Sequence, residues 1–138
     1  MKISTKFILV TVAFATPAFL FGRIIWPDAP TAPIINDDQM IAFVILAIAE
    51  ALTFGIGIAF AIFGWNLVKK AHDKKAALIL YLALIWLTVS WYPHGNFHRM
   101  IGEEVNGLLA IEYSFHLTSY IVAILAMWAF VRLIKKED

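Results

Sequence analysis

Histidine and glutamate side chains four residues apart are the groups of this sequence best suited to chemistry. His94 and His98 form one pair, and Glu112 and His116 form a second. Residues four apart share a face of a helix, so each pair directs two ligand atoms to the same side. Imidazole nitrogens and carboxylate oxygens bind iron, copper, zinc and manganese. The sequence therefore predicts a transition-metal site formed by His94, His98, Glu112 and His116.

Glu50 is a further candidate for this site, because it interrupts a long apolar run. Ionisable groups in such runs usually face the protein interior or a wet cavity. We expect Glu50 to be a fifth ligand or a group that orients an imidazole. A non-haem ion is favoured over haem, because neighbouring histidines on one helix cannot bracket a macrocycle. The chain contains no cysteine, which excludes thiolate ligands and iron–sulfur clusters.

The composition indicates that these groups are held in a membrane. The chain has 138 residues, of which 62% are hydrophobic and 15% charged, whereas soluble domains have about 45–50% and about 25%. An ordinary soluble domain and a disordered chain are therefore excluded. Continuous apolar runs in lipid must be helical, since every backbone amide needs an internal partner. We expect an all-α integral membrane protein, a single domain built as a four-transmembrane-helix bundle. The expected spans are about 7–26, 40–68, 76–92 and 108–134.

Basic residues collect on one side of these four spans. Positive charge favours the cytoplasmic side, so both termini are expected there. Segments 27–39 and 93–107, with the histidine pair, are then extracytoplasmic. The expected partners are the lipid bilayer and other membrane subunits or further copies of the chain. Nucleic acid is not expected at a net charge of +1. The cytoplasmic basic residues are Lys2, Lys6, Lys69, Lys70, Lys74, Lys75, Arg132, Lys135 and Lys136.

The first apolar run has a second interpretation. Lys2 and Lys6, followed by an apolar stretch and Ala13-Phe14-Ala15, resemble a secretory signal with a small-residue cleavage site. Cleavage there would leave a short apolar core, residues 7–12. We therefore favour an uncleaved first helix, with cleavage as the alternative.

A short extracytoplasmic helix is expected before the last span. Pro93 suits the first positions of a helix, because its φ angle is fixed and it needs no amide partner. Gly102 suits the end. Arg99 is expected to pair with Glu103, Glu104 or lipid phosphate.

The second span carries two local signals. Asp37 or Asp38 is expected to cap its start through a side-chain oxygen. Small residues at four-residue spacing then form a ridge on which another helix can pack closely. Aromatic residues near the run ends, Tyr92 among them, are expected in the headgroup layer. The ridge consists of Ala47, Ala51, Gly55 and Ala59.

Three functions are compatible with these features. The first is a metal-bearing oxidoreductase, or a subunit of a membrane oxidase or monooxygenase complex, with the catalytic residues unassigned. The second is a metal-free structural or accessory subunit of a larger membrane complex. The third is proton or ion handling in an oligomer, with Glu50, Glu112 and His116 as the relay. The sequence patterns of Rossmann, Walker and zincin enzymes are absent.

Overall fold

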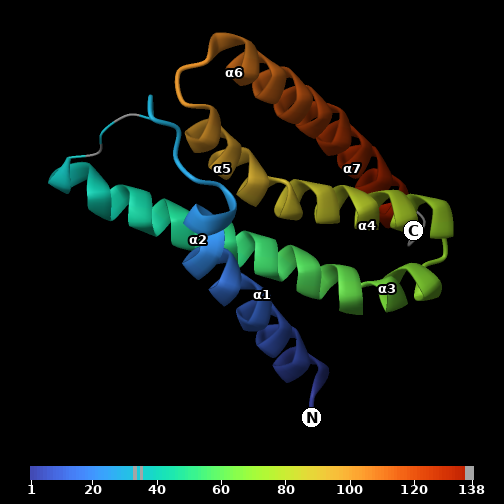
Figure 1. The fold of residues 1–138 in the computed structure, drawn as a ribbon. Coiled ribbons are helices and arrows are strands. Elements are labelled where there is room, and N and C mark those ends of the chain that lie inside the picture. Colours follow the sequence, from blue (N-terminus) through green and yellow to red (C-terminus); the bar gives the residue numbers. More distant parts are fainter. Residues whose placement is uncertain (33, 35, 136–138) are drawn as a thin grey trace.

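The computed structural model describes residues 1–32, 34 and 36–135, which form helices and short connections. The chain is 85% helical, and the described residues contain no strand. Four stretches are long and apolar enough to cross a membrane (Figure 1). This confirms the all-helical prediction and the number of candidate spans. The four stretches are Ile3–Ile25, Gln39–Phe63, Lys74–Ile101 and Val105–Ile134.

The helix boundaries place the third span differently from the prediction. The third span is expected to end at Tyr92, but it extends to Ile101, with Ser90 joining its two helical segments. The expected short helix is therefore an extension of this span. Pro93 is accommodated because it lies in the first turn of this extension, where a missing amide costs little. The extension ends as expected at Gly102, whose φ of 63° favours glycine. The elements are α1 (Ile3–Ile25), α2 (Asp37–Phe63), α3 (Trp65–Lys70), α4 (Lys74–Val89), α5 (Trp91–Ile101), α6 (Val105–Glu112), the π-helical η1 (Tyr113–Leu117) and α7 (Thr118–Ile134).

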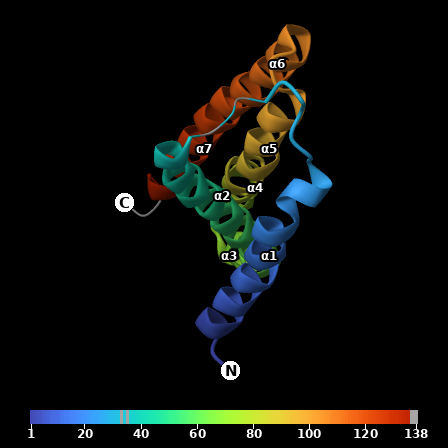
Figure 2. The same ribbon diagram turned by 60° about the vertical axis from the view of Figure 1, so that its left-hand side comes forward.

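The small-residue ridge of α2 packs against α1, as predicted. Ala51 and Ala59 are 2% and 0% exposed. A side chain added at Gly55 would collide with the backbone oxygen of Thr11, so only glycine allows the two backbones to approach this closely. Figure 2 shows α1 crossing α2, and the two helices are in contact.

The remaining helices pack in chain order, with α4 on α2 and α7 on α4. The rings of Phe7 and Phe63 lie 6.4 Å apart, which brings the start of α1 to the end of α2. Arg132 Nη2 lies 2.9 Å from Asp73 Oδ2, which brings the end of α7 to the start of α4. The segments predicted to share one side of the membrane therefore lie at one end of the molecule.

The start of α2 corrects the predicted cap. Asn36, not Asp37 or Asp38, is the N-cap residue, and its Oδ1 accepts from the Gln39 amide at 2.9 Å. Gln39 Oε1 accepts in return from the Asn36 amide at 3.2 Å. This reciprocal capping box satisfies two free amides, whereas an aspartate one residue later would satisfy one.

Arg99 also differs from the prediction. It binds Asp28 in two-pronged fashion, with Nε to Oδ1 at 2.9 Å and Nη2 to Oδ2 at 2.6 Å, instead of pairing with Glu103 or Glu104. The planar guanidinium matches a carboxylate in this geometry. Glu104 is used differently, because its carboxylate caps α6 by accepting from the Asn106 and Gly107 amides.

Most large apolar side chains point outward. The buried apolar core consists mainly of alanines, with Val68 and Tyr92, while Ile24, Leu67 and Ile124 are 74%, 65% and 69% exposed. Only 11% of the most apolar window of the last span is buried. Such a surface needs a cover of lipid or protein.

Candidate metal centre

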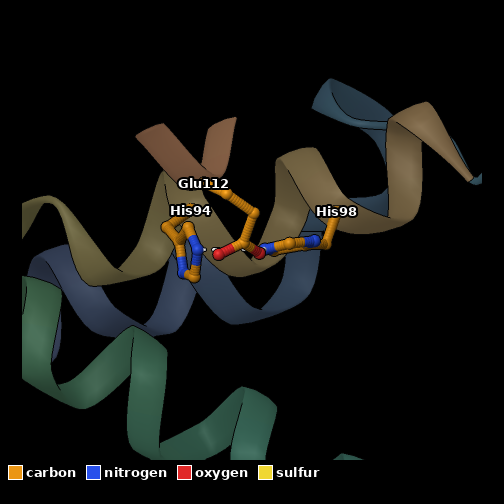
Figure 3. Close-up of side chains that lie close together, drawn as sticks. All are labelled: His94, His98 and Glu112. Carbon is orange, nitrogen blue, oxygen red and sulfur yellow. Dashed lines mark hydrogen bonds and ion pairs between the residues drawn. The ribbon is translucent and has the colours of Figure 1, made fainter. Parts of the chain in front are cut away.

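His94 and His98 lie on one face of α5, as their spacing predicts. Their Nε2 atoms are 2.9 Å apart. Glu112, the last residue of α6, approaches from the returning helix, with Oε1 3.2 Å from His98 Nε2 (Figure 3). One ligand atom from each of the three residues lies within 4.8 Å of the others. The turn around Gly102 therefore brings together three ligand atoms from two helices.

The two separations from His98 Nε2, to His94 Nε2 and to Glu112 Oε1, suit a metal ion. Metal–nitrogen and metal–oxygen bonds of about 2.0–2.2 Å place two neighbouring ligands about 3.0–3.5 Å apart, for bond angles between a right angle and the tetrahedral value. The observed 2.9 Å and 3.2 Å lie at or near this range. Two histidines and one carboxylate form the ligand set typical of non-haem iron(II) sites with open positions.

His116 contacts the cluster through Glu112. Its Nδ1 lies 2.5 Å from Glu112 Oε2, while the other oxygen faces His98. Four of the five predicted ligands thus lie in one contiguous group, in which His116 is bonded to a ligand oxygen. Such an outer partner fixes the orientation of the ligand that it contacts.

The helix that carries His116 is wider than an ordinary α-helix. Residues Tyr113–Leu117 form a π-helical turn between α6 and α7. Single π-helical turns are frequent at functional sites, because the extra residue redirects the side chains that follow. No feature of the sequence indicated this turn.

Aromatic rings hold the cluster from one side. The ring of His94 stacks on Phe115 at a centroid distance of 3.8 Å and an interplanar angle of 13°. Trp91 stacks on His94 at 5.5 Å and 9°. The polar side remains open, since the side chains of His98 and Glu112 are 32% and 41% exposed. The stacking limits rotation of the His94 ring, while the opening leaves access to the ligand atoms.

Glu50 lies apart from this group. Its carboxylate faces Gly95, where any side chain would collide with it. Tyr92 and Asn96, on the same side of α5, line a cavity of about 30 Å³ with Glu50 and Arg23. The predicted inclusion of Glu50 among the ligands therefore has no support in the geometry.

Tyr92 corrects the expectation that it lies in the headgroup layer. It is 6% exposed, and its hydroxyl donates to the backbone oxygen of Ala18 at 2.6 Å. Asn96 is 5% exposed and donates to the oxygen of Tyr92 at 2.8 Å. Their spacing of four residues would have placed both on one helix face. That Tyr92 bonds to α1 could not be read from the sequence.

Asp28 ties the loop after α1 to the last turn of α5. It bonds to Arg99 and, at 2.8 Å, to Arg23, and the Ala29 amide donates to the Arg99 oxygen at 3.0 Å. The hydrogen bond from Arg99 holds the pKa of Asp28 below its ordinary value. Partial burial raises this pKa, but the positive charges of Arg23 and Arg99 lower it further, and the net shift is downward. This contact lies beside His98 in the sequence and fixes the end of the helix that carries it.

The centre thus combines three converging ligand atoms, a carboxylate bridged to a fourth group, and an open side. Comparison with protein-family models, with curated proteins and with solved structures gives no match to the chain.

Proposed function

We propose that the chain is an integral membrane protein that binds one transition-metal ion through His94 Nε2, His98 Nε2 and Glu112 Oε1. The observation that carries the proposal is the convergence of these atoms, from two helices, within 4.8 Å. Iron(II) suits the set best, and manganese, copper and zinc are alternatives. The protein would act as an oxidoreductase or as a subunit of a membrane oxidase or monooxygenase complex.

The membrane arrangement follows from length and charge. Four apolar helices of 23 to 30 residues are long enough to cross a bilayer. Both termini and the basic segments belong to the cytoplasmic side in this proposal, because lysine and arginine favour it. The metal centre then lies toward the extracytoplasmic face, where the third span ends and the fourth begins.

The ligand number supports a reactive rather than a structural ion. Structural zinc sites are closed by four protein ligands, whereas three ligands leave room for water or substrate. An ion with open positions can polarise a bound group or exchange electrons with it. His116 Nδ1 would donate to the Glu112 carboxylate and keep that ligand oriented.

Metal analysis of the purified protein tests the proposal. The protein is prepared without a histidine tag, loaded with iron(II), manganese(II) or zinc(II), and analysed for bound metal by mass spectrometry. We expect one ion per chain, loss of that ion in His98→Ala, and weakening of about 10–100-fold in His116→Ala. His72→Ala is the matched control, since His72 lies between α3 and α4, among the basic residues. An unchanged metal content in His98→Ala would refute the site.

A second candidate is proton handling without a metal. His94, His98, Glu112 and His116 form a continuous chain of contacts at 2.9, 3.2 and 2.5 Å. Such a chain can pass a proton between its ends. Proton flux in liposomes that is abolished in Glu112→Gln, from protein that binds no metal, would favour this function over the first.

A further inference from the structure

A second cavity adjoins the metal centre on the far side of His116. It has a volume of about 490 Å³ and is lined by residues of α2, α4, α5, η1 and α7. Cavities of about 300–1,000 Å³ are typical of small-molecule sites. Four of its wall residues carry aromatic rings, the His116 imidazole included, and one of them, Tyr120, is 71% exposed. The lining residues are Thr53, Leu87, Trp91, Phe115, His116, Ser119, Tyr120 and Ala123.

Ser119 provides an unused hydrogen-bond donor in this cavity. Its Oγ is buried and has no hydrogen-bond partner among the described residues. A serine in a helix usually donates to the carbonyl four residues back, which here is that of Phe115. That oxygen already accepts from the amide and from Oγ1 of Thr118, the latter at 3.0 Å. The π-helical turn thus leaves the buried Ser119 hydroxyl without an acceptor among the described residues, and a rotation about its χ1 torsion would turn it into the cavity that the residue lines.

His116 lines the same cavity and provides an acceptor. Its Nδ1 bonds to Glu112, so in the neutral imidazole the proton lies on Nδ1 and Nε2 accepts. Thr53 differs from both groups, because its hydroxyl donates to the Ala49 oxygen at 2.7 Å and is already satisfied. Among the described residues, the cavity wall therefore carries one donor and one acceptor that have no hydrogen-bond partner, three residues apart along the chain.

We propose that this cavity binds a lipophilic quinol. A phenolic hydroxyl is the group that fits both free partners, since its hydrogen is donated to His116 Nε2 and its oxygen accepts from Ser119. The aromatic ring packs among Trp91, Phe115 and Tyr120, and the apolar tail extends into the bilayer between α2 and α7. The inference rests on the proposed membrane location and not on a bound metal.

Calorimetric titration tests the site. Metal-stripped protein in lipid nanodiscs is titrated anaerobically with a benzoquinol that carries a ten-carbon tail, with empty nanodiscs as the reference. We expect saturable binding of one quinol per chain. Ser119→Ala should weaken it about tenfold through loss of one hydrogen bond, and Ala123→Phe should abolish it by filling the cavity.

Two controls are matched to these variants. Thr53→Val removes a hydroxyl from the same wall, but one that is already bonded, so affinity should be unchanged. Val122→Phe adds the same ring on the neighbouring residue, which lines a different cavity, between α4 and α7. The quinol dimethyl ether, which cannot donate, should bind the original protein at least tenfold more weakly and tests the acceptor without any mutation.

The outcomes separate this inference from the metal proposal. Equal weakening in Ser119→Ala and Thr53→Val, or uptake no greater than by empty nanodiscs, would overturn the quinol site while leaving the metal result intact. Quinol binding that persists in His98→Ala, beside loss of metal, would support the site independently. If Ala123→Phe loses its helical circular dichroism, the site is judged from the affinity of the dimethyl ether and from the affinity of Ser119→Ala for the quinol.

Discussion

The two sides of α5 differ in what they do with their polar groups. Tyr92 and Asn96 face α1 and α2, are 6% and 5% exposed, and bond to backbone oxygens. His94 and His98 face the returning helix, are partly exposed, and bond to each other and to a carboxylate. Polar groups bonded to backbone stabilise packing, whereas side-chain ligand atoms left open to one side can accept an ion. The helix therefore carries a structural side and a candidate functional side.

Replacing Tyr92 by alanine tests the structural side and should have the largest effect on stability. The change removes the bond to Ala18 and the ring contacts to Trp26 and Phe54, at centroid distances of 5.4 and 5.1 Å. We expect a loss of about 3–5 kcal/mol in the free energy of unfolding. Unfolding by denaturant in detergent measures it.

The control is Tyr113→Ala, in which the removed ring is 68% exposed, so that a change of less than about 0.5 kcal/mol is expected. Equal losses in the two variants would mean that the inner side of α5 does not carry the packing.

Glu112→Gln tests the other side and should separate binding from stability. The amide keeps the size of the side chain but loses the charge that a metal needs, so metal affinity should fall by more than about a hundredfold. Stability should change little, because the side chain is 41% exposed. Metal titration and thermal unfolding of the same preparation measure both quantities.

Glu103→Gln removes a carboxylate beyond the cluster and should leave metal affinity unchanged. A large fall in unfolding temperature in Glu112→Gln, with metal affinity retained, would reverse the assignment of the two sides.

The sequence predicted the parts of this comparison that depend on local spacing. The apolar runs gave four spans, and the four-residue intervals gave the pairs His94–His98 and Glu112–His116. It did not predict that Pro93 lies inside the third span, because the polar residues around it indicate a separate short helix outside the membrane and not the continuation of an apolar run. The predicted ligand role of Glu50 has no support in the geometry for a similar reason, because depth in the membrane does not specify which side of α5 a residue of α2 meets.

The sequence also did not predict contacts between segments that are distant along the chain. The bond from Tyr92 to Ala18 and the pairing of Arg99 with Asp28 join residues more than 70 positions apart. Neither has a sequence pattern, because each depends on how α1 crosses the other helices. The π-helical turn at Tyr113–Leu117 changes the direction of His116 without any marker residue.

Tyr92→Phe sharpens the structural side with a smaller change. It removes only the hydroxyl and leaves the Ala18 oxygen with its helical bond, so we expect a loss of about 1 kcal/mol. Denaturant unfolding measures it against Tyr81→Phe, which removes the hydroxyl that donates to the Ala61 oxygen at 2.5 Å between α4 and α2. Similar losses are expected if both tyrosines act as single links between helices. No loss in Tyr92→Phe would assign the contribution of Tyr92 to its ring alone.

The smallest expected effect is the pH dependence of the contact between Asp28 and Arg99, which anchors the last turn of α5. Because Arg99 lowers the pKa of Asp28 in the folded state, the contact stabilises the protein above the ordinary pKa of 3.8 and loses this contribution as the pH falls below it. The contribution should stay below about 1 kcal/mol, since the carboxylate is 37% exposed and screened by water. Unfolding temperatures between pH 6 and pH 3 measure it, and Asp28→Asn should lose part of the acid-dependent fall that Glu103→Gln retains.

Because Asp28 fixes only the end of α5, metal affinity at pH 6 should be the same in Asp28→Asn as in the original protein. A large decrease would show that the candidate functional side depends on this anchor.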